Sequence, residues 1–321
     1  MALRCAILDD YQNVALKLAD WSPVAADLDI KVFDTHLGGP DKVVAALKDF
    51  TVIVAMRERT PFPRQVIEAL PELKLLITTG MRNASIDLDA AKARCVTVSG
   101  TGSFGNPTSA IAFGLMLELT RRIGYENARM HRGAAWQSTI GPDLEGLTLG
   151  IFGLGKLGAR SAAIAQAFGM NVIAWSQNLI AERCREIGVD YAERDELFRR
   201  ADFVSIHVLL SPRTRGAIGG RELGLMKPSA YLINTARGPI VDEAALLEAL
   251  RAKRIAGAGL DVFDVEPLPL DHPFRKLDNV VLTPHLGYVS EQNYRKFFAD
   301  VVEDIRGFLD GKPERVIGEV A

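Results

Sequence analysis

Short apolar segments alternate with longer stretches of helical periodicity along most of the chain. In the first third, the segments that suit buried strands are residues 5–8, 52–55, 75–77 and 96–98. After residue 146 the alternation is more regular, and the strand candidates are 147–152, 171–175, 203–208, 231–234, 259–263 and 280–283. Repeated strands and helices are typical of parallel sheets with helices on both faces. The pattern predicts an α/β protein whose second part is a six-stranded doubly wound sheet.

A boundary between domains is predicted at residues 100–107, which contain three glycines and a proline. Asn106 and Pro107 suit the N-cap and first turn of a helix over 109–120. That helix is apolar nearly all round and is therefore expected to be buried. A last helix is expected near 291–309, where the chain could return to the first domain.

Composition and charge narrow the class of protein. A length of 321 residues suggests two domains, at roughly 150 residues each. The net charge of −2 argues against binding to nucleic acid or to an anionic membrane, because both need a basic face. No apolar run approaches the roughly 18 residues of a membrane span, and the start indicates a first strand, not a signal peptide. The distant cysteines Cys5, Cys95 and Cys184 suit a reduced cytoplasmic protein with neither a disulfide framework nor a metal site.

The most specific local motif is the glycine-rich sequence Gly153-Leu-Gly155-Lys-Leu-Gly158. It follows the strand at 147–152 and opens a helix over 156–168, the setting in which a GxGxxG sequence binds a dinucleotide. Gly153 permits the tight turn, Gly155 lets a pyrophosphate approach the backbone, and Gly158 lets helix and strand lie close together.

The start of that helix offers backbone N–H groups, including those of Lys156 and Leu157, and the positive end of the helix dipole to phosphates. The alternative interpretation is a tight strand–helix turn that binds no ligand. The predicted strand before the motif and the helix after it favour the dinucleotide site over this alternative. The motif therefore predicts a dinucleotide site.

The residue after the next strand, 171–175, usually decides between the two nicotinamide dinucleotides. An acidic residue there would bind the ribose 2′-hydroxyl of NAD, but this chain has Ser176. Ser176 and Asn178 could instead donate hydrogen bonds to a 2′-phosphate, with Arg183 or Arg185 adding positive charge. We expect both NAD and NADP to be used, with a preference for NADP.

Three polar side chains follow later strands, at the edge where ligands bind in open α/β sheets. Arg237 could bind a carboxylate with two parallel hydrogen bonds. Glu266 would fix the tautomer of His285 and stabilise its protonated form, so that His285 could donate a proton to a reduced carbonyl. A lone arginine or histidine is more often structural, but three such residues beside a dinucleotide helix predict catalysis.

These motifs resemble those of the D-isomer-specific 2-hydroxyacid dehydrogenase family. The resemblance covers nearly the whole chain and rests on GLGKLG, HVLLSPRTRG, MKPSAYLINTARGPIVDEAALLEAL, GAGLDVFDVEPLP, LDNVVLTPHLG and FLDGKP. It implies two Rossmann-like domains, with an NAD(P)-binding domain at 102–288 inserted into a discontinuous, flavodoxin-like catalytic domain at 1–101 and 289–321. It also implies a homodimer.

The resemblance assigns roles to individual residues. Arg237 matches the family's substrate-orienting arginine, Glu266 the partner of the histidine, and His285 the acid/base. Asp261 matches the aspartate that faces the nicotinamide carboxamide. Three further residues lie in stretches that line the cofactor in relatives: His207, Thr214 and Ala236.

The segment 79–87 resembles the loop whose backbone amides hold the substrate carboxylate. Its candidate substrate-binding residues are Met81, Arg82 and Asn83, and Arg57 matches a family arginine near the same site. Tyr288 is a further candidate substrate-binding residue. Arg82 stands where relatives usually have glycine, and Tyr288 stands where they tend to have a small residue, so both could reshape the substrate pocket. Arg57 and Arg82 could equally be salt-bridged or solvated surface residues.

The resulting hypothesis is an NAD(P)-dependent oxidoreductase that reduces a 2-keto acid such as glyoxylate, hydroxypyruvate or pyruvate. Glu266 argues against the formate dehydrogenase branch, which has glutamine there. The alternative is a dinucleotide-sensing interaction protein, since the C-terminal-binding corepressors share this fold and these motifs. The absence of an added peptide-docking segment favours the enzyme.

Overall fold

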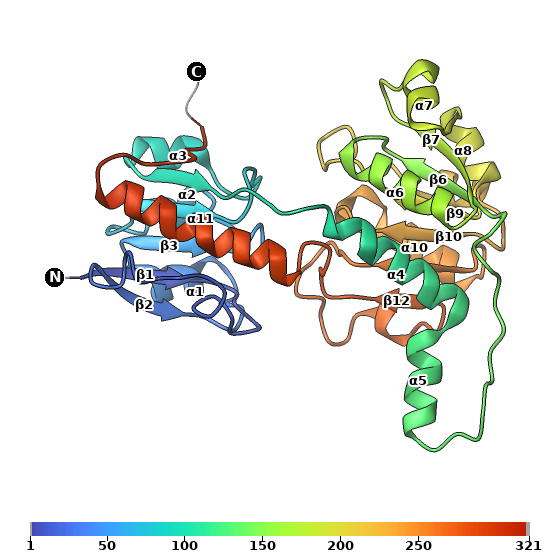
Figure 1. Cartoon of the computed structure of the whole chain (residues 1–321), viewed down its shortest axis with the longest axis horizontal. Coiled ribbons are helices and arrows are strands. Elements are labelled where there is room, and N and C mark those ends of the chain that lie inside the picture. Colours follow the sequence, from blue (N-terminus) through green and yellow to red (C-terminus); the bar gives the residue numbers. More distant parts are fainter. Residues whose placement is uncertain (1, 319–321) are drawn as a thin grey trace. The chain divides into compact units, whose positions relative to one another are not determined.

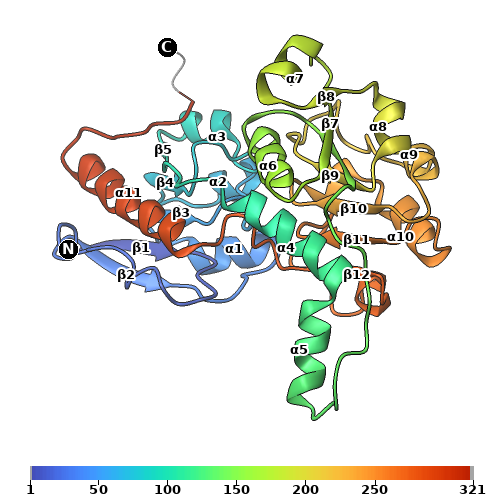
Figure 2. The ribbon, with the colours of Figure 1, turned by 45° about the vertical axis from the view of Figure 1, so that its right-hand side comes forward.

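The computed structural model describes residues 2–318 and divides the chain into two compact units. Unit 1 consists of Met1–Gly105 with Ser290–Ala321, and unit 2 of Asn106–Val289. The units therefore change after residues 105 and 289, where the sequence predicted changes after 101 and 288. Each unit is a parallel sheet with helices, which confirms the expected α/β fold class (Figures 1 and 2).

Unit 1 has a five-stranded sheet in the flavodoxin-like order β2-β1-β3-β4-β5. The strands are β1 (Leu3–Ile7), β2 (Leu28–Val32), β3 (Val52–Ala55), β4 (Leu75–Thr78) and β5 (Thr97–Gly100). The helices are α1 (Pro40–Leu47), α2 (Arg64–Glu68), α3 (Leu88–Ala93) and α11 (Glu291–Leu309). Strand β2 is not among the predicted strands, because this edge strand alternates apolar and polar residues and has no continuous apolar run.

The end of the chain completes unit 1. Helix α11 lies against β4, and Val316 pairs antiparallel with Ser99 on the edge strand β5. Arg315 holds this segment, since its Nε donates to Asp304 Oδ1 and its Nη2 to the Asp300 carbonyl, both at 2.9 Å. Asp304 is fully buried, and its Oδ2 has no hydrogen-bond partner among residues 2–318. Burial raises the pKa of Asp304 to about 7, although Arg315 opposes the shift.

Unit 2 has a seven-stranded parallel sheet in the order β12-β11-β10-β9-β6-β7-β8. Its strands are β6 (Thr148–Phe152), β7 (Asn171–Trp175), β8 (Asp190–Tyr191), β9 (Phe203–Ile206), β10 (Tyr231–Asn234), β11 (Gly257–Leu260) and β12 (Val280–Leu282). Its helices are α4 (Pro107–Arg121), α5 (Ile123–His131), α6 (Lys156–Ala167), α7 (Ala181–Ile187), α8 (Arg194–Arg200), α9 (Gly220–Leu225) and α10 (Glu243–Arg251). The seventh strand, β8, is two residues long and carries no apolar run, which explains why six strands were predicted. Asn106 precedes α4 as expected, but its side chain makes no cap hydrogen bond.

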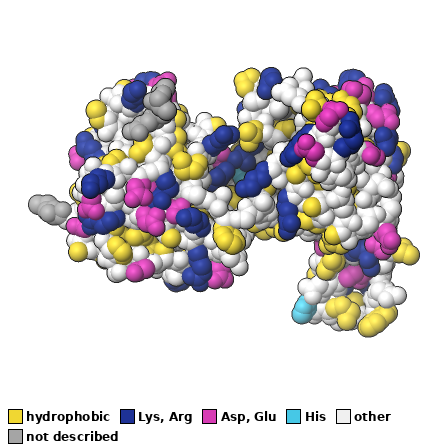
Figure 3. Space-filling view, turned by 45° about the horizontal axis from the view of Figure 1, so that its top comes forward, with side chains coloured by type: hydrophobic (Ala, Val, Ile, Leu, Met, Phe, Trp, Pro, Cys, Tyr) yellow, Lys and Arg dark blue, Asp and Glu magenta, His cyan; other side chains and the backbone are white. Residues whose placement is uncertain are grey.

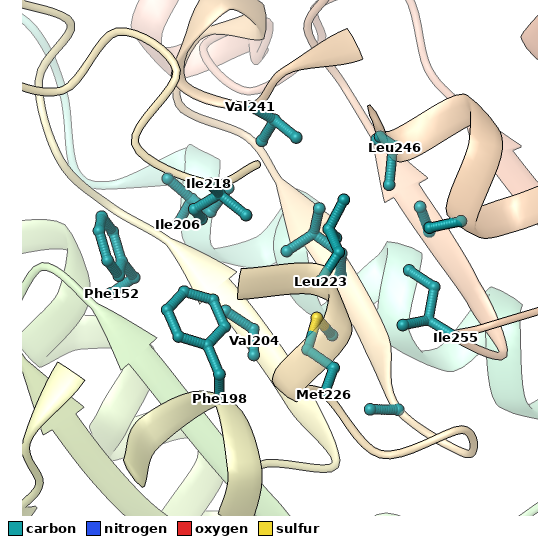
Figure 4. Packing of buried hydrophobic residues seen from close by; sticks show 14 of the residues in the cluster. Phe152, Phe198, Val204, Ile206, Ile218, Leu223, Met226, Val241, Leu246 and Ile255 are labelled. Atoms are coloured by element: carbon teal, nitrogen blue, oxygen red, sulfur yellow. The ribbon is translucent and has the colours of Figure 1, made fainter. Parts of the chain in front are cut away.

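The sheet of unit 2 is buried on both faces. Side chains alternate along β6, so that Ile151 joins the core formed with α4 and α6 while Phe152 joins the core formed with α8, α9 and α10. Figure 4 shows the second core, where Phe152 and Phe198 lie beside Val204 and Ile206 of β9. This burial holds the carboxyl ends of the central strands in one rigid edge. Within the described residues, no helix has the length and apolar character needed to cross a membrane.

Helix α5 and residues 132–147 form an arm that projects from unit 2 (Figures 1 and 2), and we call it the α5 arm. Glu126 Oε1 holds its two sides together by accepting hydrogen bonds of 2.8–2.9 Å from Ser138 N, Ser138 Oγ and Thr139 Oγ1. These bonds, that of Thr139 above all, lower the pKa of Glu126 to about 2. Five large apolar side chains of the arm are exposed: Ile123, Tyr125, Met130, Trp136 and Ile140. Figure 3 shows hydrophobic side chains gathered at the end of the arm.

Candidate active site

The centre of the site is a histidine–glutamate pair in unit 2. His285 follows β12 and Glu266 follows β11, and the two strands are neighbours in the sheet. His285 Nδ1 lies 2.6 Å from Glu266 Oε2, while Glu266 Oε1 accepts a 2.9 Å hydrogen bond from the Phe263 N–H. With Nδ1 held by a carboxylate, the proton on that nitrogen is fixed. Nε2 makes no hydrogen bond within the described chain, so it is the nitrogen available to a substrate.

The backbone of His285 has an unusual conformation that Asp261 supports. Its φ is +54°, in the left-handed region that non-glycine residues rarely adopt, and its N–H donates to the carbonyls of Asp261 and Thr283 at 2.9 and 3.0 Å. Asp261 is fully buried and accepts from Thr283 Oγ1, Leu286 N and Gly287 N at 2.6–2.8 Å. Burial raises the pKa of Asp261, and these donors oppose the rise. The carboxylate thus shapes the turn that carries the histidine.

Arg237 stands at the end of β10, in a turn that the side chain of Asn234 closes. Asn234 Oδ1 accepts from the Ala236 N–H at 3.1 Å, and Asn234 Nδ2 donates to the Arg237 carbonyl at 3.0 Å. Arg237 Nη1 donates to the Ala236 carbonyl at 2.7 Å. A Cβ at Gly238 would collide with the backbone of Phe263, so this turn lies directly against the loop that leads to Glu266.

The glycine-rich turn between β6 and α6 has the shape of a phosphate cradle. Gly153 has φ +112°, and a Cβ at Gly158 would collide with the Gly153 carbonyl, so both positions require glycine. Gly155 differs from them, because its φ is ordinary and an added Cβ would meet nothing within 4 Å. Glycine at 155 is therefore not required by the packing of the protein itself, and the open space beside it suits a bound ligand.

The backbone donors of this turn support the same interpretation. The N–H groups of Lys156, Leu157 and Gly158, at the start of α6, donate to no acceptor within residues 2–318. Three such groups at the positive end of a helix suit an anion. Thr235, after β10, adds a buried hydroxyl that has no partner in the described chain and that a bound ligand would satisfy. These residues fit a dinucleotide.

Ser176, where an acid was expected, is joined to the glycine-rich turn. The Leu154 N–H donates to Ser176 Oγ at 2.7 Å, so the serine braces the turn while its own O–H stays available to a ligand. Asn178 is exposed. The arginines expected to add charge lie on α7 in ion pairs, Arg183 with Glu186 and Arg185 with Glu182. These pairs are solvent-exposed and therefore weak.

His207 and Thr214 follow β9, between the turn of β6 and that of β10. His207 Nε2 lies 2.9 Å from Ser205 Oγ, and burial lowers the pKa of His207 to about 4, so it is neutral at physiological pH. Thr214 Oγ1 accepts from Ser211 N at 2.8 Å and donates to the Leu209 carbonyl at 2.6 Å, which closes the turn after β9. The structure thus gives Thr214 a role in loop shape.

The candidate substrate loop, residues 79–87, lies in unit 1 and is held by its own side chains. Asn83 Nδ2 donates to the Arg57 carbonyl and to Thr78 Oγ1 at 2.7 and 2.9 Å, and Asn83 Oδ1 accepts from Ser85 N and Ser85 Oγ. The side chain of Asn83 therefore folds the loop. The backbone N–H groups of residues 81–84 donate to no acceptor in the described chain, which leaves them for an anion.

Arg57 lies at the base of this loop, and Met81 and Arg82 lie on its exposed side. Arg57 Nη1 donates to the Thr79 carbonyl at 3.2 Å, and a Cβ at Gly80, which has φ +96°, would collide with that guanidinium. Arg82 is exposed, and no hydrogen bond or ion pair joins its side chain to another residue of 2–318. Arg57 thus belongs to the loop's framework, whereas Arg82 is available to a ligand.

Four residues that support the site were not predicted from the sequence. Asn234 had a detectable signal, because an asparagine at a strand end often closes a turn two residues later. The other three make contacts across long sequence separations and therefore left no local signal. Thr79 Oγ1 accepts from the Arg57 N–H, Thr108 Oγ1 donates to the Gly287 carbonyl, and Thr283 Oγ1 donates to Asp261 Oδ1.

Comparison with known proteins supports one family. The model of the D-isomer specific 2-hydroxyacid dehydrogenase NAD-binding domain matches residues 113–287. A glyoxylate reductase of Korarchaeum cryptofilum is 36% identical over 276 residues, which is 84% of this chain and 83% of that protein.

Two further relatives are named for phosphoglycerate. A D-3-phosphoglycerate dehydrogenase of Methanocaldococcus jannaschii is 37% identical over 85% of this chain, which spans only 52% of that longer protein. The crystal structure of a phosphoglycerate oxidoreductase from Vibrio cholerae has a TM-score of 0.91 at 33% identity and covers 96% of this chain and 99% of that one. The similarity thus extends over both units of the chain.

Proposed function

This chain belongs to the D-isomer-specific 2-hydroxyacid dehydrogenase family, and from that premise we propose that it is an NAD(P)-dependent 2-keto acid reductase. The observation that carries the proposal is the 2.6 Å contact between His285 and Glu266, at the same sheet edge as the glycine-rich turn. The proposed substrates are small 2-keto acids of the glyoxylate, hydroxypyruvate and pyruvate type. Glyoxylate reductase and hydroxypyruvate reductase are names of relatives.

The side chains of unit 2 would perform the proton chemistry. A reduced nicotinamide dinucleotide, when bound, supplies the hydride for the carbonyl carbon. His285 would donate the Nε2 proton to the carbonyl oxygen, and Glu266 would stabilise the imidazolium until that transfer. Arg237 would bind the carboxylate of the substrate and polarise its carbonyl. Buried His207 is neutral at working pH and is no rival to His285 as the acid.

The proposed preference for NADP follows from Ser176. Because its lone pair accepts from the Leu154 N–H, its own proton points to another acceptor, and a 2′-phosphate offers only acceptors. The absence of a carboxylate also removes the repulsion that would exclude a 2′-phosphate. Asn178, exposed beside it, is the second proposed donor. NAD would still bind, since the pyrophosphate site is common to both dinucleotides.

The loop of unit 1 would take the substrate's anionic end. The unpaired N–H groups of residues 81–84, including those of Met81, Arg82 and Asn83, would bind the carboxylate, and Arg57 would add positive charge at the base of the loop. Asp261 and Ala236 would face the nicotinamide ring, as their places at the ends of β11 and β10 suggest.

We further propose a homodimer that uses the α5 arm. No residue of α5 is buried, although the arm is braced by Glu126 and by Gly141, where a Cβ would collide with the Thr120 carbonyl. A rigid arm with exposed apolar side chains suits burial against a second copy. Light scattering on the wild type and on the double variant Trp136→Ser/Ile140→Ser tests this: the variant should be monomeric.

The free thiols of Cys5, Cys95 and Cys184 suit a reducing compartment such as the cytoplasm.

The test of the function is a turnover assay with glyoxylate, hydroxypyruvate and pyruvate, each with NADH and with NADPH. We expect turnover of at least one keto acid and a product of the D configuration where the product is chiral. His285→Ala is the control, because it should bind the dinucleotide but not reduce the keto acid. Tight dinucleotide binding without turnover of any keto acid would contradict the proposal and favour a dinucleotide-sensing interaction protein.

A further inference from the structure

Tyr288 has a fixed position beside the proposed acid, and the mechanism above does not use it. Its ring centroid lies 5.3 Å from that of His285 at an interplanar angle of 74°, an edge-to-face contact. The preceding residue, Gly287, is bound at both ends, since its N–H donates to Asp261 Oδ2 and its carbonyl accepts from Thr108 Oγ1, each at 2.8 Å. The backbone therefore presents the tyrosine to the imidazole in one place.

The imidazole needs such a neighbour. The bond from Nδ1 to Glu266 fixes one atom of the ring, but the ring plane can still turn about that bond and move Nε2. His285 itself sits in a left-handed backbone conformation, where ordinary side-chain preferences give little guidance. An aromatic edge-to-face contact favours one arrangement over others by a factor of roughly 2 to 12.

We infer that Tyr288 is a positioning residue for His285: its ring holds the imidazole in the plane from which Nε2 reaches the carbonyl oxygen. The inference rests on the proposed keto acid reduction and names a residue for that same site. It is the ring of Tyr288 that acts here, and it acts through the histidine. Phenylalanine at this position should therefore support the same rate of reduction as tyrosine. Removal of the ring should not change the rate further once His285 has been replaced.

The kinetic test compares Tyr288→Phe and Tyr288→Leu with Tyr191→Leu. Tyr191 is a matched control because it lies on β8 in the same unit and its hydroxyl binds Glu193 at 3.0 Å, away from His285. The readout is the single-turnover rate of keto acid reduction, which excludes product release. Tyr288→Leu should slow this step roughly threefold to tenfold, with the dinucleotide Kd unchanged. Tyr288→Phe and Tyr191→Leu should match the wild type.

A double-mutant cycle shows whether Tyr288 acts through His285. In a His285→Ala background, Tyr288→Leu should cause no further loss of the residual rate. An equal loss in both backgrounds would overturn the inference, because the tyrosine would then act on the substrate or on the fold. A Phe variant as slow as the Leu variant would overturn it as well, since the hydroxyl would be the active group.

A spectroscopic readout does not depend on turnover. The imidazole proton signals of His285, assigned by their loss in His285→Ala, should carry a ring-current shift that persists in Tyr288→Phe and disappears in Tyr288→Leu. Unchanged signals in Tyr288→Leu would overturn the inference while the wild type still reduces keto acids. A wild type that reduces no keto acid would instead overturn the proposed function, and with it this role for Tyr288.

Discussion

The carboxyl-terminal edges of the two sheets are built in opposite ways. In unit 2, the carboxylates of Asp261 and Glu266 and nearby backbone groups hold side chains in place, and the groups left for a ligand include His285 Nε2. In unit 1, the side chains of Asn83 and Arg57 hold the loop in place, and the groups left for a ligand are backbone N–H donors of residues 81–84. Substitution at the first edge therefore removes a chemical group, whereas substitution at the second changes the shape of a loop.

Buried carboxylates show the same contrast. Asp261 in unit 2 and Asp304 in unit 1 are both fully buried, and burial raises the pKa of each. Asp261 accepts hydrogen bonds on both oxygens, while Asp304 accepts from Arg315 on Oδ1 and leaves Oδ2 without a partner in the described chain. The first carboxylate organises a turn. The second lowers the stability of the fold, because one of its buried oxygens has no hydrogen bond in the described chain to replace the water that it loses.

The largest effect is expected for His285→Ala, which removes the group that the edge of unit 2 presents. The loss of a general acid should lower kcat by roughly 10²–10⁴. Dinucleotide binding, measured by fluorescence titration, should persist because the phosphate cradle at Gly155 is unaltered. Near-normal turnover would refute the role of His285.

The matching test in unit 1 is Gly80→Ala, with Gly105→Ala as its control. Both glycines have positive φ, but a Cβ at 80 would displace the Arg57 guanidinium while a Cβ at 105 would meet nothing within 4 Å. The first variant should raise the keto acid KM roughly tenfold, about 1.4 kcal/mol, at little cost in dinucleotide binding. The second should lose some stability and keep its KM. Equal kinetics in the two variants would mean that the loop shape does not matter.

Ser176→Asp should turn the dinucleotide preference toward NADH, by roughly tenfold in the ratio of kcat/KM values. The carboxylate can still accept from the Leu154 N–H, so the glycine-rich turn should survive. Ser176→Ala is the control, because it removes that acceptor and should weaken both dinucleotides alike. A wild type already selective for NADH would show that another residue binds the ribose.

Asp304→Asn tests the buried carboxylate of unit 1. With a folded-state pKa of about 7, Asp304 keeps its proton up to neutral pH in the folded protein, whereas in the unfolded chain it ionises near its ordinary value of 3.8. Its favourable contribution is therefore complete only below about pH 3.8, falls steadily as the pH rises from 3.8 toward 7, and is fully lost above 7. Between pH 5 and pH 8, the wild type should lose roughly 2–3 kcal/mol more unfolding free energy than the Asn variant, with most of the loss below pH 7. Parallel pH profiles from urea unfolding would contradict this.

Arg82→Gly should have the smallest effect. This variant tests whether the loop of unit 1 recognises a substituent of the substrate in addition to its carboxylate. If the arginine contacts a substituent of the substrate, its loss should alter the ranking of keto acids by roughly threefold in kcat/KM. Arg200→Ala, an exposed arginine of α8 paired with Glu196, is the control. An unchanged ranking would show that Arg82 is a solvated surface residue.

Most strands with continuous apolar runs could be predicted from the sequence to within two residues, whereas β11 was predicted at 259–263 and lies at Gly257–Leu260. Strands β3, β7 and β10 have the predicted bounds, because both faces of each are buried. Strands β2 and β8 could not be predicted, because β2 alternates apolar and polar residues and β8 has only two residues, so neither has a continuous apolar run. Glu266 and His285 could be assigned to one sheet edge because parallel strands end together. The hydrogen bond from Asn83 to the Arg57 carbonyl and that from the Leu154 N–H to Ser176 could not be predicted. Both depend on how loops fold in space, which no pattern along the sequence indicates.

The insertion of unit 2 within unit 1 orders events during synthesis. Residues 106–289 leave the ribosome before α11 and before Val316, which pairs with the edge strand β5. Unit 2 can therefore fold while the chain is still growing, whereas the sheet of unit 1 waits with β5 uncovered. The contacts of Arg315 with Asp300 and Asp304 end that interval, since they form only when residue 315 has left the ribosome.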